Sequence, residues 1–237
     1  MPPDQSPNML SRIQAISFDL DDTLWDCAPA IRNAEKALYE WHKQKTPAIT
    51  KVHSPESLME YRKQVRAAYP ELTRCVTAIR KQGLKTLLLE YGYPEGWAEE
   101  AFAVFYKARS EVVLYEGVID MLDRLNQTFR LAAITNGNAD LQSIGIEKHF
   151  ERIYAANLTL LEKPAPDMFH QCLADMDIPA DALLHIGDNP VTDVHGAAAV
   201  GVQTLWFNPY NHDWPEHLEP PNYEVQAIPD VVTLFQQ

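Results

Sequence analysis

A short apolar run near the start of the chain ends abruptly at a cluster of carboxylates, and this feature constrains the fold most. The run from Ile13 to Phe18 is followed by Asp19, Asp21 and Asp22. An apolar run that contains Ile and Phe and has polar boundaries indicates a strand buried on both faces of a sheet. If extended geometry continues one residue further, the side chains of Asp19 and Asp21 leave the same face. The sequence therefore predicts two carboxylates at the carboxyl end of a strand, the edge where open α/β sheets bind ligands.

This carboxylate pair predicts a bound cation. Two like charges about 4 Å apart repel by roughly 4 kcal/mol at an effective dielectric constant near 20. Mg²⁺ fits because it uses one or two carboxylates together with waters and a substrate phosphate. A calcium loop of the EF-hand type is excluded, because Leu24 stands where that loop needs glycine and Ala30 where it needs glutamate. A solvated turn, which also favours aspartate, is the alternative.

Composition narrows the class of protein. The 237 residues suffice for one large domain or for a domain with an inserted partner. The net charge of -13 argues against broad binding to nucleic acids or anionic membranes, but it leaves a small phosphorylated ligand possible. The widely spaced Cys27, Cys75 and Cys172 predict free thiols in a reducing compartment. Segment 1–12 lacks the composition of a signal peptide, and no apolar run approaches the roughly 18 residues that span a bilayer. We therefore expect a cytoplasmic protein.

Residues 27–112 have the pattern of a bundle of about four helices. Apolar residues recur there at helical spacing. The segment Ser54-Pro55-Glu56 is typical of a helix start, with a capping residue, a first-turn proline and an early acid. Gly92 and Pro94 mark a turn between the last two helices.

From Tyr115 onward, strand and helix patterns alternate. Strands are predicted at residues 131–135, 153–155, 182–186 and 202–207, and helices at 118–125, 166–176 and 193–200. Such alternation indicates right-handed βαβ units and a parallel sheet, so the fold class is α/β. A helical insertion after the first strand of such a sheet forms a cap over its carboxyl edge.

Polar groups also follow the later strands. Thr135-Asn136-Gly137 can present a hydroxyl and backbone N–H groups to an anion, although a plain turn explains it equally well. Lys163 lies in a stiff loop before two prolines, where a lysine is usually a solvated surface residue. Asp188 follows the strand at 182–186, and Asp193 is placed to cap the next helix, which could be its whole role.

In this order the residues resemble the haloacid dehalogenase superfamily. All four signature motifs of the superfamily are matched at compatible spacing, by Asp19-x-Asp21-x-Thr23, Thr135, Lys163, and Asp188 with Asp193. The resemblance implies a Rossmann-like catalytic core formed by residues 1–26 and 113–237. It also implies that residues 27–112 are the superfamily's helical type of cap.

The resemblance implies a phosphatase mechanism. Asp19 corresponds to the nucleophile that becomes an aspartyl phosphate, which splits one difficult displacement into two easier steps. Asp21 corresponds to the general acid and base. Thr135 and the amide of Asn136 would bind phosphoryl oxygens, and Lys163 would balance the charge of nucleophile and phosphate.

The same resemblance implies a magnesium site. The side chains of Asp19 and Asp188 and the backbone carbonyl of Asp21 would bind Mg²⁺, which screens the repulsion between two anions. Asp193 would support Lys163 or the metal from the second layer of contacts. Dehalogenases of the superfamily attack carbon, need no metal and lack the second aspartate, so Asp21 favours phosphate chemistry.

Finer details resemble the bacterial YigB-type phosphatases of the flavin pathway. These details are the segment 133–139, Lys163-Pro164 and Gly187-Asp188. The resemblance implies 5-amino-6-(5-phospho-D-ribitylamino)uracil of riboflavin synthesis, or flavin mononucleotide (FMN), as the small phosphorylated substrate. The alternatives are a phosphoglycolate or sugar-phosphate phosphatase, a 2-haloacid dehalogenase, and a non-catalytic binding protein on a retained fold.

The predicted cap is rich in aromatic residues and arginines. Most of its rings are expected to fill the bundle's own core, because several stand at helical spacing with aliphatic residues. One or two rings facing the sheet edge could stack on a pyrimidine or flavin, with arginine adding polar or stacking contacts. The arginines of this segment that could make such contacts are Arg62, Arg66, Arg74 and Arg80.

Overall fold

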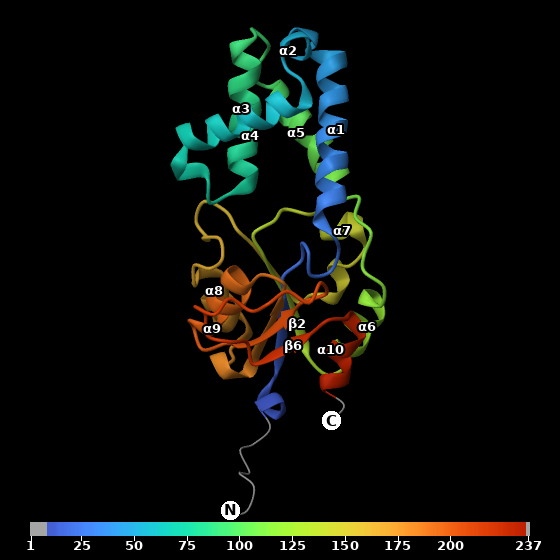
Figure 1. Cartoon of the computed structure of the whole chain (residues 1–237), viewed down its shortest axis with the longest axis vertical. Helices are drawn as coiled ribbons and strands as arrows, with labels where there is room; N and C mark the ends of the chain where they lie inside the picture. Colours follow the sequence, from blue (N-terminus) through green and yellow to red (C-terminus); the bar gives the residue numbers. More distant parts are fainter. Residues whose placement is uncertain (1–8, 236–237) are drawn as a thin grey trace, which may run out of the picture.

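The computed structural model describes residues 9–235, which form a sheet with flanking helices and a group of helices at one end (Figure 1). The described strands are β1 (Ala15–Phe18), β2 (Arg130–Thr135), β3 (Arg152–Ala155), β4 (Leu183–Gly187), β5 (Gln203–Phe207) and β6 (Tyr223–Val225). Their order is β3-β2-β1-β4-β5-β6, and every neighbouring pair is parallel. This confirms the α/β class, and strands β2 to β5 lie within one residue of their predicted bounds. The short strand β6 was not predicted.

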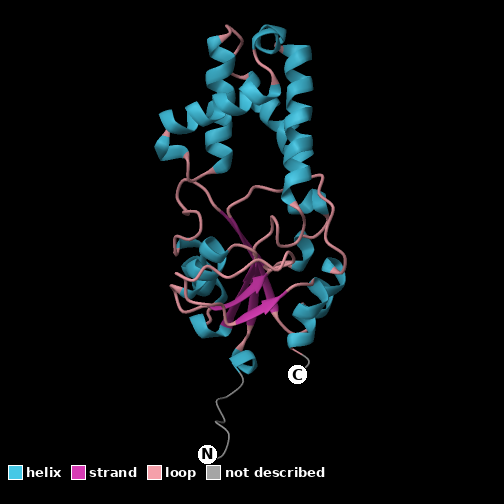
Figure 2. Cartoon of the chain, in the orientation of Figure 1, coloured by secondary structure: helices cyan, strands magenta, loops and turns pink. Residues whose placement is uncertain are grey.

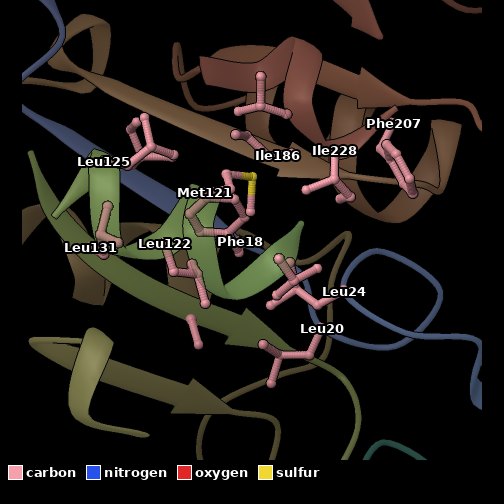
Figure 3. Packing of buried hydrophobic residues seen from close by; sticks show 14 of the residues in the cluster. Phe18, Leu20, Leu24, Met121, Leu122, Leu125, Leu131, Ile186, Phe207 and Ile228 are labelled. Atoms are coloured by element: carbon pink, nitrogen blue, oxygen red, sulfur yellow. The ribbon is translucent and has the colours of Figure 1, made fainter. Parts of the chain in front are cut away.

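The first strand lies at the centre of the sheet and is buried on both faces. Phe18 is paired with Ala133 of β2 on one side and with Ile186 of β4 on the other. Ile16 and Phe18 belong to one apolar cluster, whereas Ala15 belongs to the cluster on the opposite face. Figure 3 shows the packing around Phe18 in the first cluster. This burial on both faces is what the continuous apolar run in the sequence indicated.

Helices cover both faces of the sheet, with α6 and α10 on one side and α8 and α9 on the other (Figure 1). The helices of this part are α6 (Val118–Leu125), α7 (Leu141–Ile144), α8 (Asp167–Met176), the π-helix η5 (Pro190–His195), α9 (Gly196–Ala198) and α10 (Ile228–Leu234). Short 3₁₀ turns are η1 (Met9–Arg12), η3 (Glu147–His149) and η4 (Ala180–Ala182). The helix predicted at 193–200 was placed too late, because the helical turns begin at Pro190.

The segment between β1 and α6 consists of helices joined by turns (Figure 2). These are α1 (Cys27–Lys45), α2 (Pro47–Val52), α3 (Pro55–Ala68), the 3₁₀ turn η2 (Pro70–Leu72), α4 (Val76–Glu90) and α5 (Trp97–Arg109). They share an apolar cluster of their own, which contains several of the aromatic rings. Ser54 caps α3 as predicted, with its hydroxyl accepting from the amide of Ser57. The inserted helical bundle of the predicted fold class is therefore present.

Two connecting segments of the chain join the helices to the sheet, and they run side by side. Trp25 on the outgoing chain forms an antiparallel bridge with Leu114 on the returning chain. The amide of Tyr115 donates to the carbonyl of Leu24 at 2.9 Å. The helices consequently stand over the carboxyl end of the sheet (Figure 1). Within residues 9–235, no helix has the length and apolar character needed to cross a bilayer; most of the segment 1–12 lies outside the described residues.

Candidate active site

The two aspartates after β1 line one cavity, as their spacing predicted. The amide of Asp19 donates to the carbonyl of Ile186 at 2.8 Å, which extends the strand geometry by one residue. Leu20 turns into the core and is 1% exposed. Asp19 and Asp21 both line a cavity of about 260 Å³ at the carboxyl edge of the sheet. The alternation of side chains along an extended chain thus places both carboxylates at this edge.

Lys163 is buried and lines this cavity. Its Nζ donates to Oδ1 of Asp19 at 2.7 Å and to the carbonyl of Ile134 at 2.6 Å, and it lies 2.7 Å from Oδ1 of Asp193. Burial alone would lower the pKa of Lys163, but the two carboxylates outweigh burial and raise it. The alternative of a solvated surface lysine is therefore wrong.

Asn136 fixes the loop that carries Lys163. Its Nδ2 donates to the carbonyl of Lys163 at 2.9 Å, and the amide of Lys163 donates to its Oδ1 at 2.7 Å. Because both ends of this side chain are engaged, the backbone amide of Asn136 is the group we consider for binding an anion. The neighbouring Thr135 is buried, and its Oγ1 accepts from the amide of Gly137 at 2.9 Å. These contacts agree with a turn, and the anion-binding roles of Thr135 and Asn136 stay predictions.

Asp193 does not cap the helix that follows β4. The side chain of Asn189 accepts from the amides of Val191 and Thr192 and is the cap. Asp193 lies inside the π-helix, where its Oδ2 accepts from the amide of Asn189 at 2.9 Å and its Oδ1 contacts Lys163. A side chain at Gly187 would collide with the Asp193 carboxylate, so glycine is required at the end of β4. The alternative of a purely capping role is corrected by these contacts.

A divalent cation fits the donor set at this edge. Carboxylate oxygens of Asp19, Asp188 and Asp193 lie within 4.8 Å of one another. Burial raises the pKa of Asp19 well above its usual range, and burial with the nearby Asp193 raises the pKa of Asp188 to about 7. Burial would also raise the pKa of Asp193, but Lys163 holds it well below its ordinary value. Lys163 pairs with Asp19 and Asp193 but not with Asp188, so the three carboxylates outnumber their basic partner. Oxygen ligands with excess negative charge suit Mg²⁺.

The carboxylate of Asp21 is not part of this cluster, although Asp21 lines the same cavity. Nε1 of Trp25 donates to its Oδ1 at 2.9 Å, and Nη2 of Arg109 donates to its Oδ2. Its backbone carbonyl is thus the part of Asp21 that we consider as a metal ligand. The hydroxyl of Thr23 donates to Oδ1 of Asp188 at 3.2 Å. Sequence reasoning missed Arg109, because a basic residue in the last turn of a helix is normally explained by the helix dipole.

The neighbouring acids Asp22 and Asp26 serve the start of α1. Asp22 adopts a left-handed backbone conformation with φ of 62°, and its Oδ1 accepts from the amide of Cys27 at 2.9 Å. Asp26 caps the helix by accepting from the amide of Ala28 at 2.9 Å. These structural contacts explain Asp22 and Asp26, so neither carboxylate needs a catalytic role.

A second, larger cavity of about 340 Å³ extends from the sheet edge into the helical segment. Asp21 and Gly137 line both cavities. Apolar residues line much of the larger cavity, together with the basic residues Arg62, Lys63, Arg66, Arg80 and Arg109. Among the described aromatic rings, Phe105 lines it, and the guanidinium of Arg80 lies 3.5 Å from the centre of that ring. The expectation that most rings fill the bundle core agrees with the packing of the helical segment. Stacking of a ring on a substrate stays a prediction.

This chain is similar in sequence and in fold to known proteins. Residues 13–201 match the haloacid dehalogenase-like hydrolases. The chain is 33% identical to Escherichia coli YigB, a 5-amino-6-(5-phospho-D-ribitylamino)uracil phosphatase, over 95% of this chain and 98% of YigB. It is 27% identical to the human N-acylneuraminate-9-phosphatase over 96% of this chain and 95% of that protein.

A solved structure described as a 2-haloacid dehalogenase from Pseudomonas syringae pv. Tomato DC3000 superposes with a TM-score of 0.88 at 33% identity. The match covers 94% of this chain and 98% of that one. The resemblance inferred from the four motifs is therefore confirmed, and so is the Rossmann-like parallel sheet. The chain belongs to the haloacid dehalogenase-like hydrolases, and it is an enzyme whose named relatives include phosphatases.

Proposed function

We propose that this enzyme is a Mg²⁺-dependent phosphomonoesterase that works through an aspartyl phosphate on Asp19. The observation that supports this most is that Asp21 and Gly137 line both cavities. A phosphate ester with its phosphoryl group beside Asp19 and its alcohol in the larger cavity would place the scissile P–O bond next to Asp21. That is where a general acid for the leaving oxygen has to be.

The proposed reaction has two steps. An oxygen of Asp19 forms a bond to phosphorus while the P–O bond to the alcohol breaks, and Asp21 gives its proton to the leaving oxygen. A water molecule then attacks phosphorus, Asp21 takes the proton of that water, and the bond to Asp19 breaks to release phosphate. Lys163 would stabilise the negative charge on Asp19 and on the phosphoryl oxygens throughout.

We assign the metal to the side chains of Asp19 and Asp188 and the carbonyl of Asp21, with Asp193 holding Lys163 in place. Bound Mg²⁺ would offset the repulsion between the carboxylates and the substrate dianion. Thr135 and the amide of Asn136 would bind phosphoryl oxygens. We place the division between core and cap at residues 27 and 112, with residues 1–26 and 113–237 as the core.

The best substrate under this proposal is 5-amino-6-(5-phospho-D-ribitylamino)uracil or FMN. The identity to YigB supports it, because that relative is named for the first compound. The larger cavity of about 340 Å³ supports it too, since this volume suits a leaving group of ligand size. The two-carbon leaving group of phosphoglycolate would leave most of the cavity to water. Arg80, stacked on Phe105, offers a planar guanidinium to a heterocycle.

Dehalogenation is the second candidate, because the Pseudomonas syringae structure carries that description. Release of a halide needs no proton, so a haloacid reaction has no use for the acid at Asp21. A departing anion would also be repelled by the carboxylates of Asp19 and Asp188. The acidic cluster thus favours the phosphatase, whose leaving oxygen must be protonated.

Cytoplasmic location is a prediction that agrees with the free cysteines Cys27, Cys75 and Cys172.

One panel tests these proposals together. Phosphate release is measured from the ribitylaminouracil phosphate, FMN, phosphoglycolate and sugar phosphates, with Mg²⁺ and with EDTA, and chloride release is measured from 2-chloropropionate. We expect no activity in EDTA and a kcat/KM for one of the flavin-pathway esters at least tenfold above that for phosphoglycolate, or about 1.4 kcal/mol of transition-state binding. Equal preference would remove the substrate assignment, full activity in EDTA would remove the metal site, and chloride release without phosphate release would establish the second candidate.

A further inference from the structure

Arg109 connects the helical segment to the proposed acid. It is the last residue of α5 and is 2% exposed. Its Nη2 donates to Oδ2 of Asp21, while Nε1 of Trp25 donates to Oδ1 of the same carboxylate at 2.9 Å. Trp25 lies on the chain that leaves the sheet, and Arg109 precedes the chain that returns to it. Both oxygens of Asp21 are thus held from the junction between the two parts of the molecule.

The contact continues from Arg109 into a second helix. Nε of Arg109 donates to Oδ1 of Asn138 at 3.1 Å, and Nδ2 of Asn138 donates to the hydroxyl of Thr77 at 3.0 Å. Thr77 lies in the first turn of α4. A displacement of α4 or α5 relative to the sheet would therefore break a hydrogen bond in this chain of contacts. The position of Asp21 is in this way tied to the position of the helices.

The arginine is also held where a polar ligand group would complete its contacts. Its Nη1 is buried, and no described residue accepts a hydrogen bond from it. An unpaired buried donor costs about 1–3 kcal/mol, more when it is charged. Arg109 lines the larger cavity together with Asp21 and Gly137. A side chain at Gly137 would collide with Oδ2 of Asp21, so this glycine permits the ion pair to form.

We propose that Arg109 is the positioning residue for Asp21. It holds the carboxylate at the boundary of the two cavities, where Asp21 meets the leaving oxygen of a bound ester, and it does so only while α4 and α5 stand over the sheet. This inference rests on the proposed phosphatase function and on the role of Asp21 in it. Loss of Arg109 should therefore harm protonation of the leaving oxygen and spare the attack of Asp19.

Two kinds of ester distinguish these steps. FMN, or the best alkyl ester of the panel, has an alkoxide leaving group that needs a proton, whereas the nitrophenolate of p-nitrophenyl phosphate departs without one. The constant kcat/KM covers the steps up to release of the alcohol, so the later attack of water on the aspartyl phosphate does not affect it. For Arg109→Gln we expect kcat/KM to fall about 30- to 100-fold for the alkyl ester and less than about fivefold for p-nitrophenyl phosphate. Arg109→Lys should recover part of the loss, because it keeps the charge.

Three further variants make the result decisive. Arg124→Gln removes an exposed arginine that pairs with Asp120 at 3.0 Å on α6, and should leave both esters unchanged. Asn138→Ala removes the partner of the Arg109 Nε atom, and should give a smaller loss, about three- to tenfold, again for the alkyl ester. Asn138→Ala takes the place of Arg109→Gln in the test if circular dichroism shows Arg109→Gln to be unfolded. Asp21→Asn should reproduce the selective loss.

The outcomes separate the two proposals. If Asp21→Asn lowers kcat/KM equally for both esters, the role given to Asp21 under the proposed function is wrong. A second outcome is that Asp21→Asn lowers kcat/KM for the alkyl ester alone, while the folded Arg109 and Asn138 variants lower it for both esters alike or for neither. Arg109 then does not position the acid. Selective loss in Asp21→Asn, Arg109→Gln and Asn138→Ala, with part of the loss recovered by Arg109→Lys, is the result that supports the inference.

Discussion

Replacement of Lys163 by methionine tests the electrostatics of the sheet edge. The side chain of Lys163 is 1% exposed, and its Nζ lies 2.7 Å from carboxylate oxygens of both Asp19 and Asp193. Methionine keeps most of the length and removes the charge, so two buried carboxylates lose their shared partner. Breaking a buried ion pair costs about 3–5 kcal/mol. We therefore expect the free energy of unfolding of Lys163→Met to be lower by about that amount at pH 7 in EDTA.

A second lysine on the surface provides the matched control. Lys43 contacts Glu40 at the same distance of 2.7 Å, but both side chains are 50% exposed. Such exposed pairs contribute about 0–1 kcal/mol, so Lys43→Met should be nearly neutral. Urea unfolding followed by circular dichroism measures both variants. Because the ion-pair distances are equal, the difference between the variants reflects the burial of Lys163 and its additional partners, Asp193 and the carbonyl of Ile134.

The pH dependence identifies the cause. Lys163 holds the pKa of Asp193 below its unfolded value, so the stabilisation from this pair is present above the unfolded pKa and is lost only as pH falls through the lower folded one. Without Lys163, the already raised pKa of Asp19 rises further and burial raises the pKa of Asp193, so the variant regains stability as both carboxylates become protonated. The difference in free energy of unfolding between wild type and Lys163→Met should become smaller from pH 7 to pH 5. A difference that stays constant, or a Lys163→Met protein as stable as Lys43→Met, would refute the reasoning.

Three other predictions concern the chemistry and the larger cavity. Asp19→Asn should lower phosphate release at least about 1,000-fold with an unchanged circular dichroism spectrum, because it removes the nucleophile and almost no volume; appreciable turnover would contradict the covalent mechanism. The pKa of Asp188 is raised to about 7 in the metal-free protein, so its ligand form is lost as pH falls, and calorimetry should show Mg²⁺ affinity decreasing about tenfold per pH unit below that value; a flat profile would contradict this. Gly83 of α4 lines the larger cavity, and a Cβ there meets Val65 Cγ1 at 3.8 Å, so Gly83→Leu should lower kcat/KM about tenfold more for FMN than for phosphoglycolate. The same substitution at Gly96, where a Cβ meets nothing within 4 Å, is its control, and an equal ratio in both variants would argue against the cavity as the leaving-group site.

Local sequence was sufficient where one periodicity determined the result. The apolar run before Asp19 had to be buried on both faces, and the two-residue period then placed Asp19 and Asp21 on one side of Leu20. The alternating elements after Tyr115 likewise fixed a parallel sheet. The strand β6, Tyr223–Val225, is too short to produce such a pattern.

Local sequence was insufficient where contacts across the chain select among equal candidates. Asn189 and Asp193 are both suitable helix caps, and Asp193 is excluded because Lys163, thirty positions earlier in the chain, pairs with it. Lys163 itself is indistinguishable from a surface lysine until Asn136 fixes its loop against β2. Arg109 belongs to the same class, because its partner Asp21 is 88 positions away.

The charge distribution shows how an acidic chain can admit an anionic ester. The net charge of -13 belongs largely to the outer surface, where salt screens interactions beyond about 8 Å at physiological ionic strength. Inside the larger cavity, Arg62 and Arg80 share one carboxylate, that of Glu35, at 2.9 and 3.0 Å, so this group keeps a positive charge. Arg66 adds to it on the same cavity wall. Because a concave site with poorly polarisable walls concentrates its own field, these arginines favour an anion inside the larger cavity despite the net charge of the chain. The composition that disfavours binding to extended polyanions is therefore compatible with a site for a single small one.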